Sequence, residues 1–182
     1  MNNFKYSNSV LINLITVLII PFLIWGPFFP DLIVSISALF FLYYSLKNNN
    51  FYYFSKKPFI IFLVFCIICT IISLEAENIS LSIKSSFFYF RIGVFSCFIW
   101  YLIDKDKSIL TYFYYALVLC FSVLAIDGYI QYFTGTNLVG FEILDTRISS
   151  FLGDEIIMGS YLSRWFPLFF DLFLIKKKQK YE

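Results

Sequence analysis

Histidine is absent from this sequence of 182 residues, and charged residues make up only 14% of it. The lack of histidine removes the commonest metal ligand and the usual acid–base group near neutral pH. A soluble domain usually has about 25% charged and about 45–50% apolar residues, whereas this chain is 60% apolar with a mean hydropathy of +0.78. The composition therefore excludes an ordinary soluble domain and indicates a membrane protein.

Cysteine is also scarce, and all four residues lie inside apolar runs: Cys66, Cys69, Cys97 and Cys120. The spacing of Cys66 and Cys69 matches that of a redox or zinc motif. Two small apolar residues on a membrane helix give the same spacing, and the sequence has no second Cys or His pair to complete a zinc site. We therefore expect no metal and no other cofactor.

The sequence is poor in charged residues but contains long apolar runs. Six segments approach the ~20 residues that a helix needs to cross ~30 Å of hydrocarbon, and they cover residues 10–25, 28–46, 58–74, 87–103, 109–133 and 156–175. Backbone groups find no water in the bilayer, so only helices or closed barrels cross it, and continuous rather than alternating apolar runs favour helices. The sequence predicts an all-α transmembrane helix bundle of about six spans, in a single domain over residues 1–182.

The basic residues are distributed unequally between the connections. With the N-terminus in the cytoplasm, ten lysines fall on the cytoplasmic side, and only Lys84 and Arg147 fall on the outer side. Such a bias follows the positive-inside rule. We therefore expect both termini in the cytoplasm and the polar loop 134–155 outside, with the first two spans joined by the tight hairpin WGPFFPD, Trp25–Asp31.

Four ionisable residues fall within the predicted spans: Arg91, Asp127, Arg164 and Asp171. Charge at mid-membrane costs at least ~2.5–3.5 kcal/mol, so such residues usually face the protein interior and a partner. Arg91, Asp127 and Arg164 lie roughly 6, 9 and 12 Å below the outer ends of their spans, at ~1.5 Å per residue. From these depths we expect Asp127 to pair with Arg91 or Arg164.

Two interpretations of these charges remain open. In the first, an Arg–Asp–Arg network only fixes the packing of the helices. In the second, an electropositive pocket open to the outer leaflet holds an anionic headgroup, because Asp127 can fully neutralise only one arginine and Arg binds phosphate bidentately. Lys84, seven residues before Arg91, would then project on about the same helix face.

The densest polar patterning is DTRISSFLGDEIIMGSYLSRW, Asp145–Trp165. Asp154 and Glu155 stand where the sixth span begins, where acidic side chains complement the helix dipole or support the charge network. Arg147 stands upstream of them in the outer loop. From there we expect its side chain to reach over the pocket.

Small residues follow at the start of the sixth span. Gly159 and Ser163 are four residues apart with Ser160 beside them, a spacing that lets another helix approach closely. Arg164 lies on nearly the same face as Ser160. We therefore expect one side of this span to be both packed and charged.

The segment RISSFLGDEIIMGSYLSR, Arg147–Arg164, resembles the arginine-led element of the O-antigen ligase and O-antigen polymerase superfamily. Three other segments are similar to the same pattern in the same order: GPFFPD (Gly26–Asp31), YFRIGVF (Tyr89–Phe95) and DGYIQYFTGTNLVG (Asp127–Gly140). The resemblance covers most of the chain. It implies a multi-pass glycosyltransferase of the bacterial inner membrane that uses undecaprenyl-diphosphate-linked glycans at the outer face and needs no metal.

The resemblance also implies roles for particular residues. Arg147 is carried over as a contact to the donor phosphate or glycan, with Arg164, Arg91 and Lys84 as further substrate-binding candidates. Family members are longer than this chain, and the loop with the arginine and histidine residues tied to transfer lies downstream of the matched region. We therefore expect the N-terminal half of such an enzyme, which acts with its C-terminal half, and we identify no catalytic residue.

Three functions are consistent with these observations. The first is a glycan polymerase or ligase in cell-surface polysaccharide or lipopolysaccharide biosynthesis. The second is a non-catalytic membrane subunit or scaffold that binds a lipid-linked glycan. A small transporter is disfavoured, because we find neither an internal repeat nor a Gly or Pro break inside a charged span. Membrane lipid is an expected partner and nucleic acid is not.

Overall fold

The computed structural model describes residues 12–143, 147–152 and 158–181. Its regular elements in these ranges are helices, with one isolated β-bridge between Thr136 and Glu142, so the all-α prediction is confirmed for the described residues. The chain forms two compact units, where the sequence had been treated as a single domain. Unit 1 combines Met1–Pro30 with Lys107–Glu182, and unit 2 is Asp31–Asp106.

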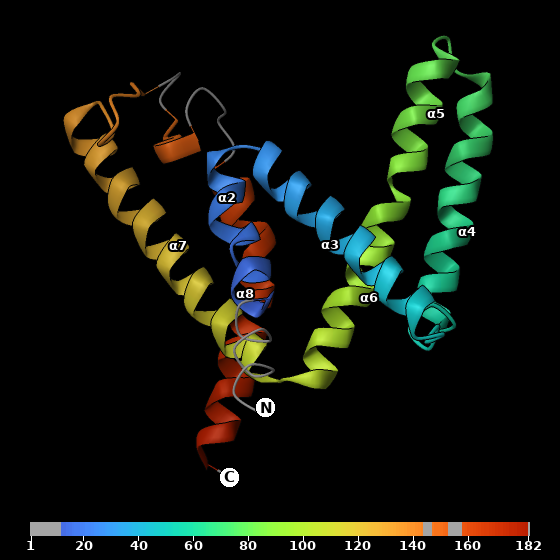
Figure 1. Cartoon of the computed structure of the whole chain (residues 1–182). Coiled ribbons are helices and arrows are strands. Elements are labelled where there is room, and N and C mark those ends of the chain that lie inside the picture. The colour runs from blue at the N-terminus through green and yellow to red at the C-terminus, as the bar shows by residue number, and fades with distance from the viewer. Residues whose placement is uncertain (1–11, 144–146, 153–157, 182) are drawn as a thin grey trace. The chain divides into compact units, whose positions relative to one another are not determined.

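The described part of unit 1 has two long helices and a shorter one near the N-terminus, which can be followed in Figure 1. A helical segment covers Ile12–Trp25 with a turn at Leu18, after which it continues as α2 (Ile19–Trp25). The remaining elements are α7 (Ser108–Thr134), the 3₁₀ turn η2 (Ser150–Leu152) and α8 (Met158–Tyr181).

The core of unit 1 joins its three helices. Ile20 of α2, Leu117 and Cys120 of α7 and Leu172 of α8 are all buried together. Tyr161 of α8 donates a hydrogen bond of 3.0 Å to the carbonyl oxygen of Ile20. These contacts hold α2 and α8 against α7, and η2 lies near the end of α2, because Phe151 and Leu152 line the same cavity as Trp25.

Unit 2 contains four helices. Its elements are α3 (Phe28–Lys47), whose first residues belong to the hairpin of unit 1, α4 (Lys57–Ile72), the 3₁₀ turn η1 (Ser73–Glu75), α5 (Ile79–Phe88) and α6 (Phe90–Lys105). The helices α5 and α6 follow each other with a break only at Tyr89. A Cβ atom at Gly93 of α6 would lie 2.5 Å from the ring of Phe62, so this glycine allows α4 and α6 to pack closely.

Four helices are long and apolar enough to cross a membrane among the described residues: Phe28–Lys47, Lys57–Glu75, Ile79–Lys105 and Ser108–Thr134. Three match the predicted spans closely, whereas the fourth predicted span begins at Ile79 rather than Phe87. Ile12–Trp25 is a shorter apolar helix, and α8 continues to Tyr181, beyond the predicted end at residue 175. Large apolar side chains such as Ile61 (70% exposed) and Leu39 (67% exposed) point away from the protein, as they do in lipid.

Candidate functional site

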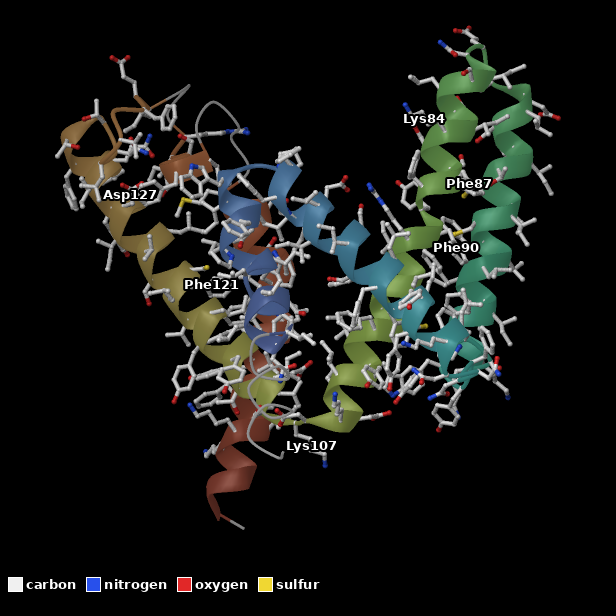
Figure 2. The ribbon with its side chains drawn as sticks, viewed as in Figure 1. Lys84, Phe87, Phe90, Lys107, Phe121 and Asp127 are labelled. Atoms are coloured by element: carbon white, nitrogen blue, oxygen red, sulfur yellow. The ribbon has the colours of Figure 1, made fainter. Side chains whose placement is uncertain are left out.

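The polar loop after α7 folds back onto the end of that helix, and Asp127 is its anchor. Asp127 is completely buried, and Figure 2 shows it on α7 close to the loop. Its carboxyl oxygens accept one hydrogen bond from the Leu138 backbone N–H at 3.0 Å and another from the Ser150 hydroxyl at 2.6 Å. Asp127 therefore ties both arms of the loop to α7.

Gln131 lies one turn further along the same face of α7 and is also completely buried. Its side-chain oxygen accepts hydrogen bonds from the backbone N–H groups of Ser149 and Ser150, at 3.1 and 2.8 Å. Its side-chain nitrogen donates to the carbonyl oxygens of Phe141 and Glu142, at 3.2 and 3.4 Å. One side chain thus satisfies backbone groups from two separate stretches of the loop.

Asn137 shapes the first arm of the loop. Its side-chain oxygen accepts hydrogen bonds from the backbone N–H groups of Val139, Gly140 and Phe141, at 3.0, 2.8 and 2.7 Å. Its side-chain nitrogen donates to the Ser150 carbonyl at 2.9 Å. We call the five buried polar residues Asp127, Gln131, Asn137, Ser149 and Ser150 the α7 loop network.

The α7 loop network sets the local backbone around Ser150. This residue has φ = 52°, in the left-handed region that non-glycine residues rarely occupy. Its N–H, carbonyl and hydroxyl groups each bond to a side chain of the network, and the hydroxyl group also lies 3.4 Å from the carbonyl oxygen of Leu124. The strained conformation therefore has specific support, and it sets the direction in which the segment carrying Arg147 approaches η2.

An apolar cavity of about 790 Å³ lies beside this loop in unit 1. Its lining combines the first hairpin between Pro21 and Pro27, Val123 of α7, and four loop and η2 residues: Val139, Phe141, Phe151 and Leu152. Every lining residue is apolar. Arg147 is exposed, four residues before Phe151, so a cation lies on the same short segment as part of an apolar wall.

The other candidate residue of unit 1, Arg164, is exposed on α8. No ion pair joins it to Asp127 among the described residues of this unit, so the predicted pairing of Asp127 with Arg164 is wrong. The carboxyl group of Asp127 is instead occupied by the loop that follows its own helix. Asp171, in the same helix, is also exposed.

The small-residue face of α8 is open within unit 1. Gly159, Ser160 and Ser163 are exposed, and a Cβ atom at Gly159 would meet no other atom within 4 Å. The packing predicted on this face thus requires a helix outside this unit, and it stays a prediction. Pro167 lies inside α8, three residues after Arg164, and the helix continues through it from Met158 to Tyr181.

Arg91 has a carboxylate partner within unit 2. Its guanidinium group forms an ion pair with Asp31 through both terminal nitrogens, and one of them also donates to the Ser35 hydroxyl at 2.9 Å. The predicted pairing of Arg91 with Asp127 would join the two units and stays a prediction. The positive charge of Arg91 is therefore already paired with the carboxylate of Asp31.

The remaining candidates are placed only in part. Lys84 is exposed on α5 of unit 2, where Figure 2 labels it. Asp154 and Glu155, which were expected to support the charge network, lie outside the described residues. Among those that are described, no group of three His, Cys, Asp or Glu side chains could hold a metal ion.

Sequence reasoning missed Gln131, Asn137, Ser149 and Ser150 because it followed charge alone. A signal for them was present: Asp127 and Gln131 are four residues apart, so both lie on one face of an otherwise apolar helix. Asp31 was also missed as the partner of Arg91, although both were placed near the outer ends of their spans. No protein-family model matches the chain, and no curated protein or solved structure matches it either.

Proposed function

We propose that this chain is an integral protein of the bacterial inner membrane that binds a polyprenyl-diphosphate-linked glycan at the loop end of unit 1. The isoprenoid chain occupies the apolar cavity, and Arg147 and Arg164 contact the diphosphate. The observation that carries the proposal is the cavity of about 790 Å³ lined by apolar residues, beside a loop with an exposed arginine. A ligand for such a place needs a hydrocarbon body and an anionic head.

The construction of the loop supports this assignment. Ligand affinity improves when the binding groups are already held in place, and the α7 loop network fixes both segments that line the cavity. Phe141 and Phe151 belong to those segments, while the nearby Arg147 remains exposed. Arginine suits a diphosphate because its planar guanidinium group donates two parallel hydrogen bonds to phosphate oxygens.

The membrane topology belongs to the same proposal: six spans, with both termini in the cytoplasm. Unit 1 supports it, because Lys176 of α8 lies 3.8 Å from the ring centre of Tyr115 near the start of α7, so basic residues gather at the end opposite the loop. Reporter fusions after Lys57, Lys107 and Lys178 are expected to report the cytoplasm. A fusion after Gly140 is expected to report the outside, and a cytoplasmic signal there would overturn the proposed location of the site.

Glycan transfer is the second part of the proposal, and its support is the resemblance to O-antigen polymerases and ligases. The cavity and arginines account for binding of the lipid-linked donor, and no residue of this chain is assigned to the transfer step itself. A non-catalytic subunit that binds the same lipid is the alternative. The alternative predicts the same binding behaviour but no transfer of the glycan.

Binding of undecaprenyl diphosphate to the purified chain tests the first part. Undecaprenol, which lacks the phosphates, is the matched ligand, and Lys107→Gln is the matched charge control at the opposite end of unit 1. A hydrogen bond to a charged group contributes about 1.5–3 kcal/mol, so Arg147→Gln and Arg164→Gln should each weaken diphosphate binding about tenfold or more. Undecaprenol binding should not change.

A variant of the cavity tests binding of the hydrocarbon part of the ligand separately from binding of its diphosphate. Leu152→Ser should weaken binding of undecaprenol and undecaprenyl diphosphate by the same factor, because both carry the same hydrocarbon. Undiminished diphosphate binding in both arginine variants would remove the phosphate role. Undiminished binding of both lipids to Leu152→Ser would remove the cavity from the proposal.

A further inference from the structure

The end of unit 2 opposite the α4–α5 connection gathers lysines and aromatic side chains. There α3 ends at Lys47, α4 begins at Lys57 and α6 ends at Lys105. We call this surface the lysine–tyrosine end and define it by Tyr43, Lys47, Phe51, Tyr52, Lys56, Lys57, Tyr101 and Lys105. None of these residues belongs to the site of unit 1.

A buried tyrosine holds this end together. Tyr53 is only 8% exposed, and its hydroxyl group donates a hydrogen bond of 3.1 Å to the carboxylate of Asp104. Its ring contacts the rings of Trp100 and Tyr101, with centroids 5.8 and 5.9 Å apart. Burial, with the neighbouring carboxylate, raises the pKa of Tyr53 to about 12, so the phenol stays neutral and the connection between α3 and α4 is held to α6.

Three lysines of this end, Lys47, Lys56 and Lys105, lie against aromatic rings. The Nζ atom of Lys56 is 3.8 Å from the ring centre of Tyr52, and the Nζ atom of Lys105 is 5.6 Å from that of Tyr101. Such contacts are typical cation–π interactions, and they hold the ammonium groups at the surface. This end carries four lysines, Lys47, Lys56, Lys57 and Lys105, and the acidic residues in the helix end and connection beside Lys105 are Asp104 and Asp106. Its net charge is therefore positive.

Exposed apolar area lies directly beside this charge. Phe51 is 45% exposed and Tyr52 is 55% exposed, and both are part of the short connection that leads to Lys56. Tyrosine side chains gather at the level of lipid headgroups, whereas a soluble anion makes no use of exposed hydrocarbon such as the ring of Phe51. A suitable ligand therefore combines a phosphate with an adjoining acyl region.

We propose that the lysine–tyrosine end binds the headgroups of acidic phospholipids, with its lysines on the lipid phosphates and Phe51 and Tyr52 in the interfacial layer. A lysine near an acidic membrane surface contributes about 1 kcal/mol, or a factor of about five in affinity. The surface thus selects acidic over zwitterionic lipid in the shell around unit 2. The site lies in a different unit from the one proposed for the lipid-linked glycan and does not depend on it.

Trp100 gives a local measurement of this selection, because it is 37% exposed and contacts Tyr53. The sequence has two other tryptophans, Trp25 and Trp165, so the full chain with both changed to Phe reports from Trp100 alone. The protein is reconstituted into phosphatidylcholine vesicles with spin-labelled phosphatidylglycerol or spin-labelled phosphatidylcholine. We expect phosphatidylglycerol to quench Trp100 more strongly, with a preference of at least about fivefold.

Two adjacent lysine pairs provide the matched variants. Lys56→Gln/Lys57→Gln should remove most of the preference, and Lys56→Arg/Lys57→Arg should retain it. Lys176→Gln/Lys177→Gln removes the same charge from unit 1 and should leave the quenching of Trp100 unchanged. An equal loss in the unit 1 variant would mean that net charge alone is responsible and would overturn the proposal.

Two conditions complete the test. Raising the salt from about 0.1 M to about 0.5 M should reduce the preference, because exposed charges are screened over a shorter distance; a preference that does not depend on salt would contradict the role of the lysines. Inorganic phosphate or a short oligonucleotide should not displace the labelled lipid at the lower salt concentration. Displacement by either would replace the membrane with a soluble anion as the ligand.

Discussion

Two aspartates show how differently the two units handle a carboxyl group near apolar surroundings. Asp127 of unit 1 is completely buried, and its partners are a backbone N–H and a hydroxyl group. The side chain of Asp31 in unit 2 is 53% exposed, and its partner is the guanidinium group of Arg91, which is 30% exposed. The buried carboxyl group has neutral partners, whereas the charged partner is found at the surface.

The difference follows from the cost of desolvation. Burying both members of an ion pair costs several kcal/mol for each ion, and their attraction offsets this only with excellent geometry and further hydrogen bonds. Neutral partners from a nearby loop require no second buried charge. The two arrangements should also respond differently to substitution: losing a buried partner costs about 1–3 kcal/mol, whereas an exposed pair contributes about 0–1 kcal/mol.

The largest effect is expected at Gln131, which joins the most segments of the α7 loop network. In Gln131→Leu, the buried backbone N–H groups of Ser149 and Ser150 lose their acceptor, at about 1–3 kcal/mol each. Thermal unfolding in detergent should show a large loss of stability. Limited proteolysis should show new cleavage within residues 136–143, whereas Tyr132→Leu at the neighbouring exposed position should change neither result.

Two substitutions of Asp127 distinguish the contribution of its hydrogen bonds to stability from that of its charge. Asp127→Ala removes the acceptor for Leu138 and Ser150 and should reduce the free energy of unfolding by about 1–3 kcal/mol. Asp127→Asn keeps one acceptor oxygen and should cost clearly less. If Asn were as harmful as Ala in the same unfolding measurement, the negative charge of Asp127 would be essential and the contrast with Asp31 would fail.

The helices were predictable because their signal is local. The second, third and fifth apolar runs gave boundaries close to those of α3, α4 and α7, since the hydrocarbon of a span is continuous in sequence. The predicted fourth span begins at Phe87, later than the helix in the structure, because Lys84 and the serines around it interrupt the apolar pattern of α5. One of those serines, Ser86, is buried in α5, and its hydroxyl group forms a hydrogen bond with the hydroxyl group of Ser73. Its polar group therefore has a partner inside unit 2.

The site was predictable only in part, because its polar contacts form when the loop after α7 folds back onto the end of that helix. Hydropathy placed Asp127 inside a span, and charge counting then suggested an arginine as its partner. The actual partners, Leu138 and Ser150, are a backbone group and a small hydroxyl side chain that carry no charge pattern. The left-handed conformation of Ser150 and the apolar cavity also arise from tertiary contacts, so no local sequence signal indicated them.

Tyr53 extends the comparison, since it gives a carboxylate of unit 2 a neutral partner. Tyr53→Phe removes the hydrogen bond to Asp104 and should reduce stability by about 0.5–1.5 kcal/mol, whereas Tyr52→Phe, at an exposed position, should have little effect. Because the folded-state pKa of Tyr53 is raised from 10.0 to about 12, its contribution is complete below pH 10 and declines as the pH rises toward 12. The stability difference between wild type and Tyr53→Phe should therefore shrink over that interval, and a constant difference would contradict it.

The smallest effect is expected at the Asp31–Arg91 pair, where a double-mutant cycle measures the interaction directly. Asp31→Asn and Arg91→Gln should each reduce the free energy of unfolding by a small amount, and their coupling energy should not exceed about 1 kcal/mol, because the pair is partly exposed. Added salt should reduce this coupling, since ions screen exposed charges, but it should leave the effect of Asp127→Ala unchanged. A salt-independent coupling of several kcal/mol would show that lipid or protein desolvates the pair in the membrane. Asp31 and Arg91 would then behave as a buried ion pair, and the two units would no longer differ in where they place a charged pair.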